Sequence, residues 1–361
     1  MKTIDFLKDN GIEALRTELA ITVKEVDDLL VLNYNQIESP KTHPIVVECR
    51  SLILDTDFKI VSRSFDRFFN LGEAPDTQAH LDWGIAEAHE KVDGSLIKIY
   101  HHRGAWHIAT RSMPYAEGAC QFGPTFRELV LRALGVQEHG FQFLCDVNLE
   151  PHLTYMCELT CAENRVVKLY EGYTLHFLSA RANTSRGWFV TDGSDAISME
   201  RMGVKRKPAL KFESEDAVRE AVRGLKNLDE GYVIYQHGIP VCKVKSPAYL
   251  AVHAIKGEGL TPKRIIQLVL VNEQAEYISV FPEDEVHFTP YVEAMQEMVQ
   301  EIEFWYDKLE GLEDQRDFAK GCKGLPFGSA MFMARKNGTS AVQEFHKMRD
   351  TYKAKVLEAY L

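Results

Sequence analysis

The segment HEKVDGSLI, residues 89–97, places a lysine, an aspartate and a glycine within one short bend, with apolar alternation on both sides. Asp-Gly accepts the positive φ angles that hairpin turns need, so Asp93 and Gly94 predict a turn between two strands. This geometry leaves Lys91 unexplained. A lysine amine is a nucleophile only when it is deprotonated, a state that desolvation and neighbouring cations or a metal favour. Lys91 is therefore a candidate nucleophile that needs cationic neighbours.

The segment VCKVKSP supplies two such cations, Lys243 and Lys245, if it forms a strand, because residues two apart project from the same face. Two adjacent ammonium groups also suit phosphate oxygens. A solvated strand face, with Val241 and Val244 partly buried, explains the same pattern equally well in isolation.

Two glutamates are candidate ligands. Glu230, before Gly231 in DEGYVIY, lies 13 residues before Lys243, a spacing that allows two adjacent antiparallel strands. A carboxylate at the mouth of a strand binds Mg²⁺, hydrogen-bonds a ribose or merely caps a turn. Glu158, in YMCELTC, is flanked by hydrophobic residues on an apparent strand, so an inward-facing acid there is costly unless it binds something.

The order of these motifs is more informative than any one of them. K-x-D-G-S from 91, the strand glutamate at 158, E-G-Y-V-I from 230 and K-x-K from 243 resemble the motifs of the covalent nucleotidyltransferases. These are the ATP-dependent DNA and RNA ligases and the mRNA capping guanylyltransferases. The resemblance implies that Lys91 attacks the α-phosphate of ATP and carries AMP as a phosphoramidate. Within that superfamily the chain is similar to the bacteriophage single-strand RNA ligases, the first phage RNA ligase family, from about residue 30 to about residue 255.

Further blocks carry the same resemblance. ECRSLIL resembles the family's Cys-Arg block and SRSFDRFFNLGE its basic-Phe-Phe-Asn block, and Tyr34 stands where the family has an ATP-contacting tyrosine. Arg67 and Arg111 stand where lysines are expected; arginine keeps the charge but prefers bidentate geometry. Phe69 is either next to the nucleotide or plain core. The resemblance implies nucleotide contacts at Tyr34, Arg50, Arg67, Phe69, Gly94, Arg111, Glu158, Glu230, Gly231, Lys243 and Lys245, and metal contacts at Glu230 and Glu158.

The chain pattern predicts an α+β fold in two domains. Residues 1–247 read as short strands separated by Gly, Asn and Asp turns with a few helices, which predicts an antiparallel-sheet nucleotidyltransferase domain. From residue 248 to 361 apolar residues recur at three- and four-residue steps, which predicts an all-helical domain. A DNA ligase or capping enzyme would continue into a β-rich OB-fold instead. The helical continuation matches the resembled family, whose C-terminal domain is associated with structured RNA such as broken tRNA.

The 361-residue chain has a net charge of −11, which argues against a protein that coats nucleic acid along its whole surface. The charge is uneven, because residues 250–317 hold 5 basic and 15 acidic residues whereas residues 318–361 hold 8 and 3. The basic tail, with Phe345 and Tyr352, is a candidate RNA-facing surface, although a solvated helix face explains its charges as well.

Seven scattered cysteines without zinc-ligand spacing predict reduced, mostly buried thiols. With no long apolar segment and no signal-peptide pattern, we expect a cytoplasmic monomer that does not bind membranes, located in the host cytoplasm if a phage encodes it.

The resemblance implies an ATP-dependent RNA ligase, acting in RNA or tRNA repair, that joins a 5′-phosphate to a 3′-hydroxyl through lysyl-AMP. ATP is the expected co-substrate, Mg²⁺ or Mn²⁺ the expected metal, and RNA ends, nicked tRNA among them, the expected partner. Two alternatives stay open: a DNA ligase or capping guanylyltransferase, and a non-catalytic RNA-binding protein on the same fold. The family's acidic metal pair in the helical domain is not cleanly reproduced, and Glu273 and Glu276 are nearby candidates left without an assignment.

Overall fold

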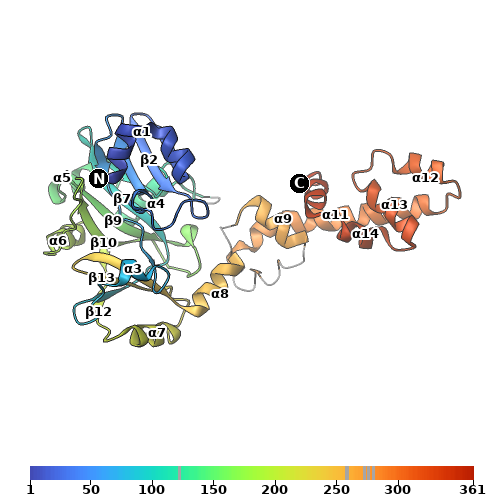
Figure 1. Ribbon diagram of the computed structural model, residues 1–361. Helices are drawn as coiled ribbons and strands as arrows, with labels where there is room; N and C mark the ends of the chain where they lie inside the picture. Colours follow the sequence, from blue (N-terminus) through green and yellow to red (C-terminus); the bar gives the residue numbers. More distant parts are fainter. Residues whose placement is uncertain (121–122, 257–259, 271–273, 275–276, 279–280) are drawn as a thin grey trace. The chain divides into compact units, whose positions relative to one another are not determined.

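A computed structural model describes residues 1–120, 123–256, 260–270, 274, 277–278 and 281–361. The chain divides into two compact units, Met1–Ala254, called here the N-terminal unit, and Ile255–Leu361, the helical unit (Figure 1). Helix α8 (Pro247–Lys256) runs through the point of division, which lies a few residues after residue 247, where the sequence pattern places the boundary. Glu273 and Glu276 lie outside the described residues.

The described part of the N-terminal unit contains three β-sheets, and nearly all of their strand pairs are antiparallel. The first sheet has the order β1 (Ile21–Val26), β2 (Leu29–Tyr34), β3 (Arg50–Asp55) and β4 (Ile60–Ser62). The second has the order β11 (Lys205–Arg206), β10 (Thr174–Ala182), β9 (Leu153–Thr160), β7 (Ser95–His102) and β8 (Ala105–Ala109). The third has the order β12 (Ala209–Leu210), β6 (Glu87–Glu90), β13 (Gly231–Gln236), β14 (Ile239–Lys245) and β5 (Phe69–Asn70).

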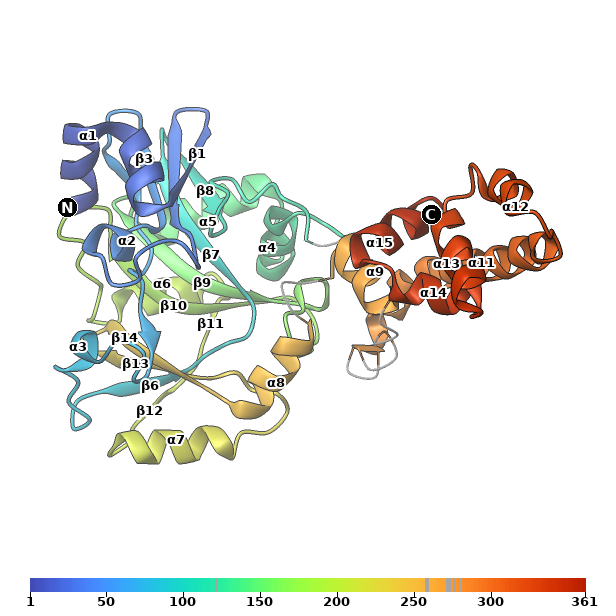
Figure 2. The same ribbon diagram turned by 45° about the vertical axis from the view of Figure 1, so that its right-hand side comes forward.

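Helices cover the outer faces of these sheets. α1 (Lys2–Leu19) and α2 (Pro44–Glu48) pack on the first sheet, and α7 (Glu215–Arg223) packs on the third, as Figure 2 shows. The second sheet packs against α4 (Phe126–Leu134), α5 (Glu138–Asn148) and α6 (Ser194–Arg201). Two short elements, α3 (Pro75–Gln78) and the 3₁₀ turn Ala162–Asn164, complete the unit.

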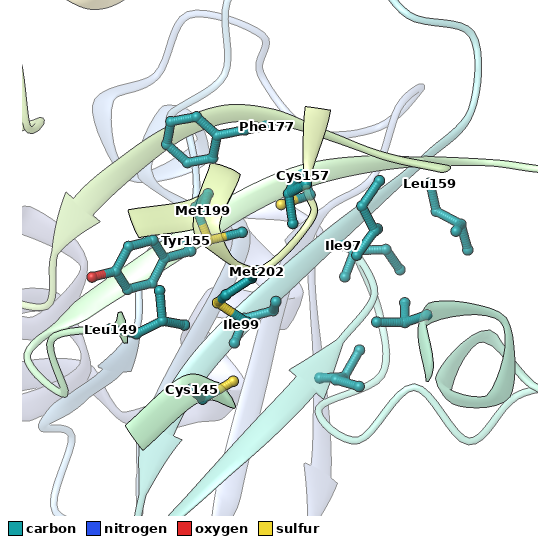
Figure 3. Packing of buried hydrophobic residues seen from close by; sticks show 14 of the residues in the cluster. Ile97, Ile99, Cys145, Leu149, Tyr155, Cys157, Leu159, Phe177, Met199 and Met202 are labelled. Carbon is teal, nitrogen blue, oxygen red and sulfur yellow. The ribbon is translucent and has the colours of Figure 1, made fainter. Parts of the chain in front are cut away.

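The alternation of β7 decides which side chains face the site. Ile97 and Ile99 point into the core beneath α5 and α6, next to Cys157 of β9 (Figure 3). Because successive strand residues project to opposite faces, Leu96 and Lys98 turn to the other side of the sheet. That other side contains the cavity described below.

One prediction about the 91–94 bend is wrong. β6 and β7 do not pair with each other; β6 belongs to the third sheet and β7 to the second, so the bend crosses between sheets and is not a hairpin turn. Among the described residues with positive φ, neither Asp93 nor Gly94 is found. Gly94 is required for a different reason, because a Cβ at this position would lie 2.2 Å from the Leu159 carbonyl oxygen.

The second unit is helical in its described residues, as the apolar spacing predicts. It consists of α9 (Pro262–Leu270), a 3₁₀ turn (Pro282–Asp284), α11 (Glu285–Glu310), α12 (Gln315–Cys322), α13 (Gly328–Asn337), α14 (Ala341–Lys347) and α15 (Asp350–Glu358). α14 begins with an N-cap, since the Ser340 hydroxyl accepts from the Gln343 backbone amide. Phe345, however, is fully buried, and the Tyr352 hydroxyl donates to the Pro326 carbonyl. The prediction that Phe345 contacts RNA is therefore wrong, because it forms core.

Two further expectations concern the cysteines and membrane-spanning helices. The seven cysteines are buried thiols, and the described residues include no disulfide. Among the helices that the structure describes, none has the length and apolarity that crossing a bilayer requires.

Candidate active site

The predicted motifs meet in one cavity of about 200 Å³ between the second and third sheets, which we call the central cavity. Of the predicted site residues, it is lined by Arg50, Lys91, Glu158, Lys243 and Lys245. Apolar side chains such as Leu96 and Val233 form much of the remaining wall. This mixture of an apolar wall and a few convergent charges is typical of a small-molecule site.

Glu230 holds two of the predicted lysines together. Its Oε2 atom accepts from the Lys91 Nζ at 2.7 Å, and its Oε1 atom accepts from the Lys245 Nζ at 2.8 Å, although Glu230 is only 3% exposed. The backbone supports this arrangement, because the Lys91 amide donates to the Gly231 carbonyl and Gly231 pairs with Lys245 across β13 and β14. A buried carboxylate shared by two ammonium groups is thus compensated on both oxygens.

Gly231 is required at this point by close packing. Its φ is +141°, and a Cβ would lie 1.9 Å from the Val244 carbonyl oxygen. Any other residue would push β13 and β14 apart and displace Glu230 from its two lysines.

The Lys243 ammonium faces an aromatic ring, because its Nζ lies 5.7 Å from the centre of the Phe68 ring. The described residues include no hydrogen-bond or ion-pair acceptor for its Nζ. Burial, followed by the nearby charges of Lys245, Lys91 and Arg50, lowers the pKa of the Lys243 ammonium to about 8. A cation that is already short of solvent and of counter-charge favours an anionic ligand.

Glu158 is the opposite case. Burial raises the pKa of its carboxyl to about 7, with a further upward contribution from Glu230 and an opposing one from Lys91. Its strand partner is His176, so both side chains project from the same face of the second sheet. At neutral pH this carboxyl can therefore bind a hydroxyl group or a cation.

A second cavity, of about 250 Å³, adjoins the first and is called here the arginine cavity. It shares Arg50, Phe68 and Lys243 with the central cavity. The lining of the arginine cavity includes Lys41 and a single acid, Glu73. The predicted nucleotide contacts in it are Tyr34, Arg50, Arg67, Phe69, Arg111 and Lys243. Three other predicted contacts line neither cavity: Gly94, Glu230 and Gly231. Five cations around one carboxylate form a site for a polyanion.

The two arginines that replace expected lysines have a visible structural reason. The Arg67 guanidinium carbon lies 4.1 Å from the centre of the Tyr34 ring, and that of Arg111 lies 4.8 Å from it. A planar guanidinium stacks on an aromatic face, whereas an ammonium acts as a point charge. Tyr34 therefore fixes both guanidinium groups at the edge of the arginine cavity.

Sequence reasoning missed the structural role of Asp93. The carboxylate is buried and accepts from the backbone amides of Val167 and Lys168 at 2.8 and 2.7 Å and from the Tyr249 hydroxyl at 2.8 Å. These contacts tie the bend that carries Lys91 to α8. The K-x-D-G spacing singled out Asp93, but only as a turn residue, since its partners lie more than 70 residues away.

Lys98 was missed altogether. It is fully buried on β7, and its Nζ donates to the Ser51 carbonyl at 2.6 Å. Ser51 has a left-handed φ of 59°, and its amide donates to the Asn33 side chain. Burial holds the pKa of the Lys98 ammonium well below its usual range. Lys98 thus supports the strained peptide that directly follows Arg50, and its only sequence signal was one lysine on an otherwise apolar strand face.

Predicted metal contacts are limited to the two glutamates. In the part of the chain that the structure describes, no group of three or more His, Cys, Asp or Glu side chains is placed to hold a metal ion. Mg²⁺ commonly uses one or two carboxylates plus phosphate oxygens, so the metal contact at Glu158 stays a prediction. Glu230 would first have to release a lysine.

The antiparallel sheets and the two charged cavities match the fold and the grouping of motif residues that the sequence predicts. The RNA ligase family model matches residues 48–249, and the chain belongs to this family. The resemblance drawn from the motifs is thereby confirmed.

Two relatives cover most of the chain. A protein of Autographa californica nuclear polyhedrosis virus, named provisionally as a bifunctional polynucleotide kinase/RNA ligase, is 34% identical over 98% of this chain. The chain spans about half, 52%, of that relative's length. The RNA ligase of Rhodothermus phage RM378 is 24% identical over 83% of this chain and 80% of its own. Among solved structures, an archaeal ATP-dependent RNA ligase is 14% identical over 75% of this chain and 68% of that chain, with a TM-score of 0.44.

Proposed function

We propose that this protein is an ATP-dependent RNA ligase that joins a 5′-phosphate to a 3′-hydroxyl through a lysyl-AMP intermediate on Lys91. The observation that carries the proposal is the convergence of Lys91, Lys243, Lys245 and Glu158 around one cavity with an adjoining arginine-rich one. Glu230 bridges two of these side chains, Lys91 and Lys245. Membership of the RNA ligase family supports the choice of RNA as substrate.

The two cavities divide the nucleotide between them. The nucleoside occupies the central cavity, where the Glu158 carboxyl accepts from or donates to a ribose hydroxyl. The triphosphate tail extends into the arginine cavity, where Arg50, Arg67 and Arg111 face its oxygens. Lys243 lines both cavities and is thus placed next to the phosphate at which they join.

Three steps follow from this placement. The Lys91 amine forms a P–N bond to the α-phosphorus, pyrophosphate leaves, and Glu230, 2.7 Å from Nζ, is close enough to take the proton that the amine must lose. A 5′-phosphate oxygen of RNA then displaces Lys91 to form a P–O–P bond. Finally the RNA 3′-hydroxyl attacks the RNA phosphate, and AMP leaves. A divalent cation held by Glu158 and substrate phosphates would neutralise developing charge.

Incubation with ATP, Mg²⁺ and a 5′-phosphorylated RNA that has a free 3′-hydroxyl tests the proposal. We expect a covalent AMP–protein adduct, sealed RNA and released AMP. An adduct formed with GTP but not ATP would point to a capping guanylyltransferase, and sealing of DNA in preference to RNA would point to a DNA ligase. RNA binding without any adduct would leave a non-catalytic binding protein.

For the helical unit we propose a role in selecting structured RNA, such as nicked tRNA. Its exposed cations Lys320, Lys323, Lys336, Lys347 and Arg349 lie in the basic tail and supply phosphate contacts. Phe345 is excluded from this role by its burial.

A fragment ending at Lys256, at the end of α8, tests that role. All residues of both cavities are retained, so we expect adenylylation to continue, within about threefold of the full-length rate. The ratio of sealing rates on a nicked stem-loop and on an unstructured oligonucleotide should fall. An unchanged ratio at both low and high salt would place substrate selection in the N-terminal unit.

A further inference from the structure

A third cavity, on the edge of the third sheet, is not used by the nucleotide as placed above. It has a volume of about 400 Å³ and is called here the edge groove; the residues of interest in its wall are Asn70, Arg219, Lys243, Lys245, Leu250 and His253. They come from β5, α7, β14 and α8, all in the N-terminal unit. The groove exists because β5 is short: it pairs with β14 only at Cys242 and Lys243, which leaves the following residues of β14 uncovered.

The charged side chains that line the edge groove are all basic. Arg219, Lys243 and Lys245 bring three cations, and among the described residues of its lining there is no carboxylate. The Arg219 guanidinium is fixed in place, since it donates to the Leu71 carbonyl at 3.3 Å and pairs with Glu215 at 2.7 Å. Asn70 and His253 add polar groups, and Leu250 an apolar one. Such a lining suits a phosphate attached to a sugar and a base.

The groove is continuous with the catalytic centre through two side chains. Lys243 and Lys245 line both the edge groove and the central cavity. The Glu230 carboxylate bridges Lys245 and Lys91. Its oxygens lie 2.8 Å from the Lys245 Nζ and 2.7 Å from the Lys91 Nζ. An anion in the groove therefore lies beside the place where AMP would be held.

We propose that the edge groove binds the 5′-phosphate end of the RNA during AMP transfer. The inference rests on the proposed ligase function and deepens it, since the second step requires an anion near Lys91 and the edge groove offers three cations next to that centre. In that step an oxygen of the RNA 5′-phosphate forms a P–O bond to the AMP phosphorus. The P–N bond to Lys91 breaks, and the amine leaves with the electron pair and takes a proton from solvent.

Helix α8 links occupancy of the groove to the catalytic bend. Leu250 and His253 of α8 line the groove, while Tyr249, on the same helix, donates to the buried Asp93 carboxylate at 2.8 Å. The His253 ring stacks on the Tyr249 ring at 5.6 Å. RNA that contacts His253 would therefore press on Tyr249. The hydrogen bond of Tyr249 to Asp93 holds the bend that carries Lys91.

Helix α7 offers a matched pair of variants. Arg219 and Arg223 are one turn apart and each pairs with a glutamate, Glu215 and Glu220, but only Arg219 lines the groove. We would measure self-adenylylation with ATP alone, then AMP transfer from the adenylylated protein to a 5′-phosphorylated oligoribonucleotide, for the full-length protein with Arg219→Ala and with Arg223→Ala.

We expect Arg219→Ala to lower the ratio of AMP transfer to self-adenylylation about tenfold, through a higher KM for RNA, as befits the loss of one charge-assisted contact. The salt dependence of RNA binding should become shallower by about one charge. Arg219→Lys should restore part of the loss, and Arg223→Ala should leave the ratio unchanged.

Three outcomes would overturn the inference: an unchanged ratio in Arg219→Ala, an equal fall in Arg223→Ala, or a rise in the KM for ATP in place of that for RNA. The last outcome would assign the groove to the nucleotide. Failure of the unsubstituted protein to form any AMP adduct would instead contradict the proposed function itself, so the two failures are distinguishable.

Discussion

Replacement of Lys91 by alanine is expected to abolish labelling of the protein by α-labelled ATP, to the level of the background. The amine that forms the P–N bond is removed, and the neighbouring Lys243 and Lys245 project from β14 and not from the bend that carries Lys91. The fold should survive, with a change in stability of within about 1 kcal/mol. After the substitution the buried Glu230 carboxylate keeps its 2.8 Å contact with Lys245, so it is not left as an unpaired buried charge.

The same variant separates the steps of the reaction. Because the final step needs no lysyl adduct, Lys91→Ala should still seal RNA that carries a chemically attached 5′-adenylate. Lys24→Ala, at an exposed position of β1 away from both cavities, serves as the control and should label normally. Persistent labelling of Lys91→Ala would place the nucleophile elsewhere and remove the basis of the proposed mechanism.

The order of the short motifs along the chain made part of the site predictable from the sequence. K-x-D-G, E-G and K-x-K each predict little alone, but their succession predicted that Lys91, Glu230 and Lys245 would meet, and the ion pairs are consistent with it. The antiparallel sheets and the helical second unit were likewise predictable, since strand alternation and helical apolar spacing reflect which face is buried.

Features that depend on distant backbone atoms could not be predicted. Gly94 was expected for its positive φ, whereas the structure requires it because of the Leu159 carbonyl, 65 residues further along the chain. Lys98 gave only one weak signal, a lysine on an otherwise apolar strand face, because its partner Ser51 lies in another sheet. Phe345 lies next to polar and charged residues in the sequence but in the core of the helical unit, since the faces of a helix differ within one turn.

Replacement of Lys243 by alanine is expected to slow self-adenylylation about 100-fold, which is the typical effect of removing one preorganised group that stabilises developing charge. This side chain lines the central cavity, the arginine cavity and the edge groove, and no other predicted residue is shared by all three. It also has no hydrogen-bond or ion-pair acceptor among the described residues to compete with phosphate. Lys245→Ala should slow the reaction too, through the loss of one cation next to the central cavity.

The pH dependence of pyrophosphate binding identifies Lys243 more specifically than the rate does. With a pKa of about 8, below the usual value for lysine, its ammonium is charged at lower pH and neutral at higher pH. Affinity for pyrophosphate should therefore weaken as the pH rises from about 7 to about 9, with an inflection near pH 8. A bound anion raises the pKa of the ammonium and so moves this inflection to higher pH.

Lys245→Ala should keep this inflection, because Lys243 is still present, whereas Lys243→Ala should lose it and bind weakly throughout. Lys243→Arg should restore affinity and remove the inflection, since a guanidinium stays charged over this range. If all three variants retained the same inflection, another group would be titrating. Lys243 would then not be the residue that recognises phosphate.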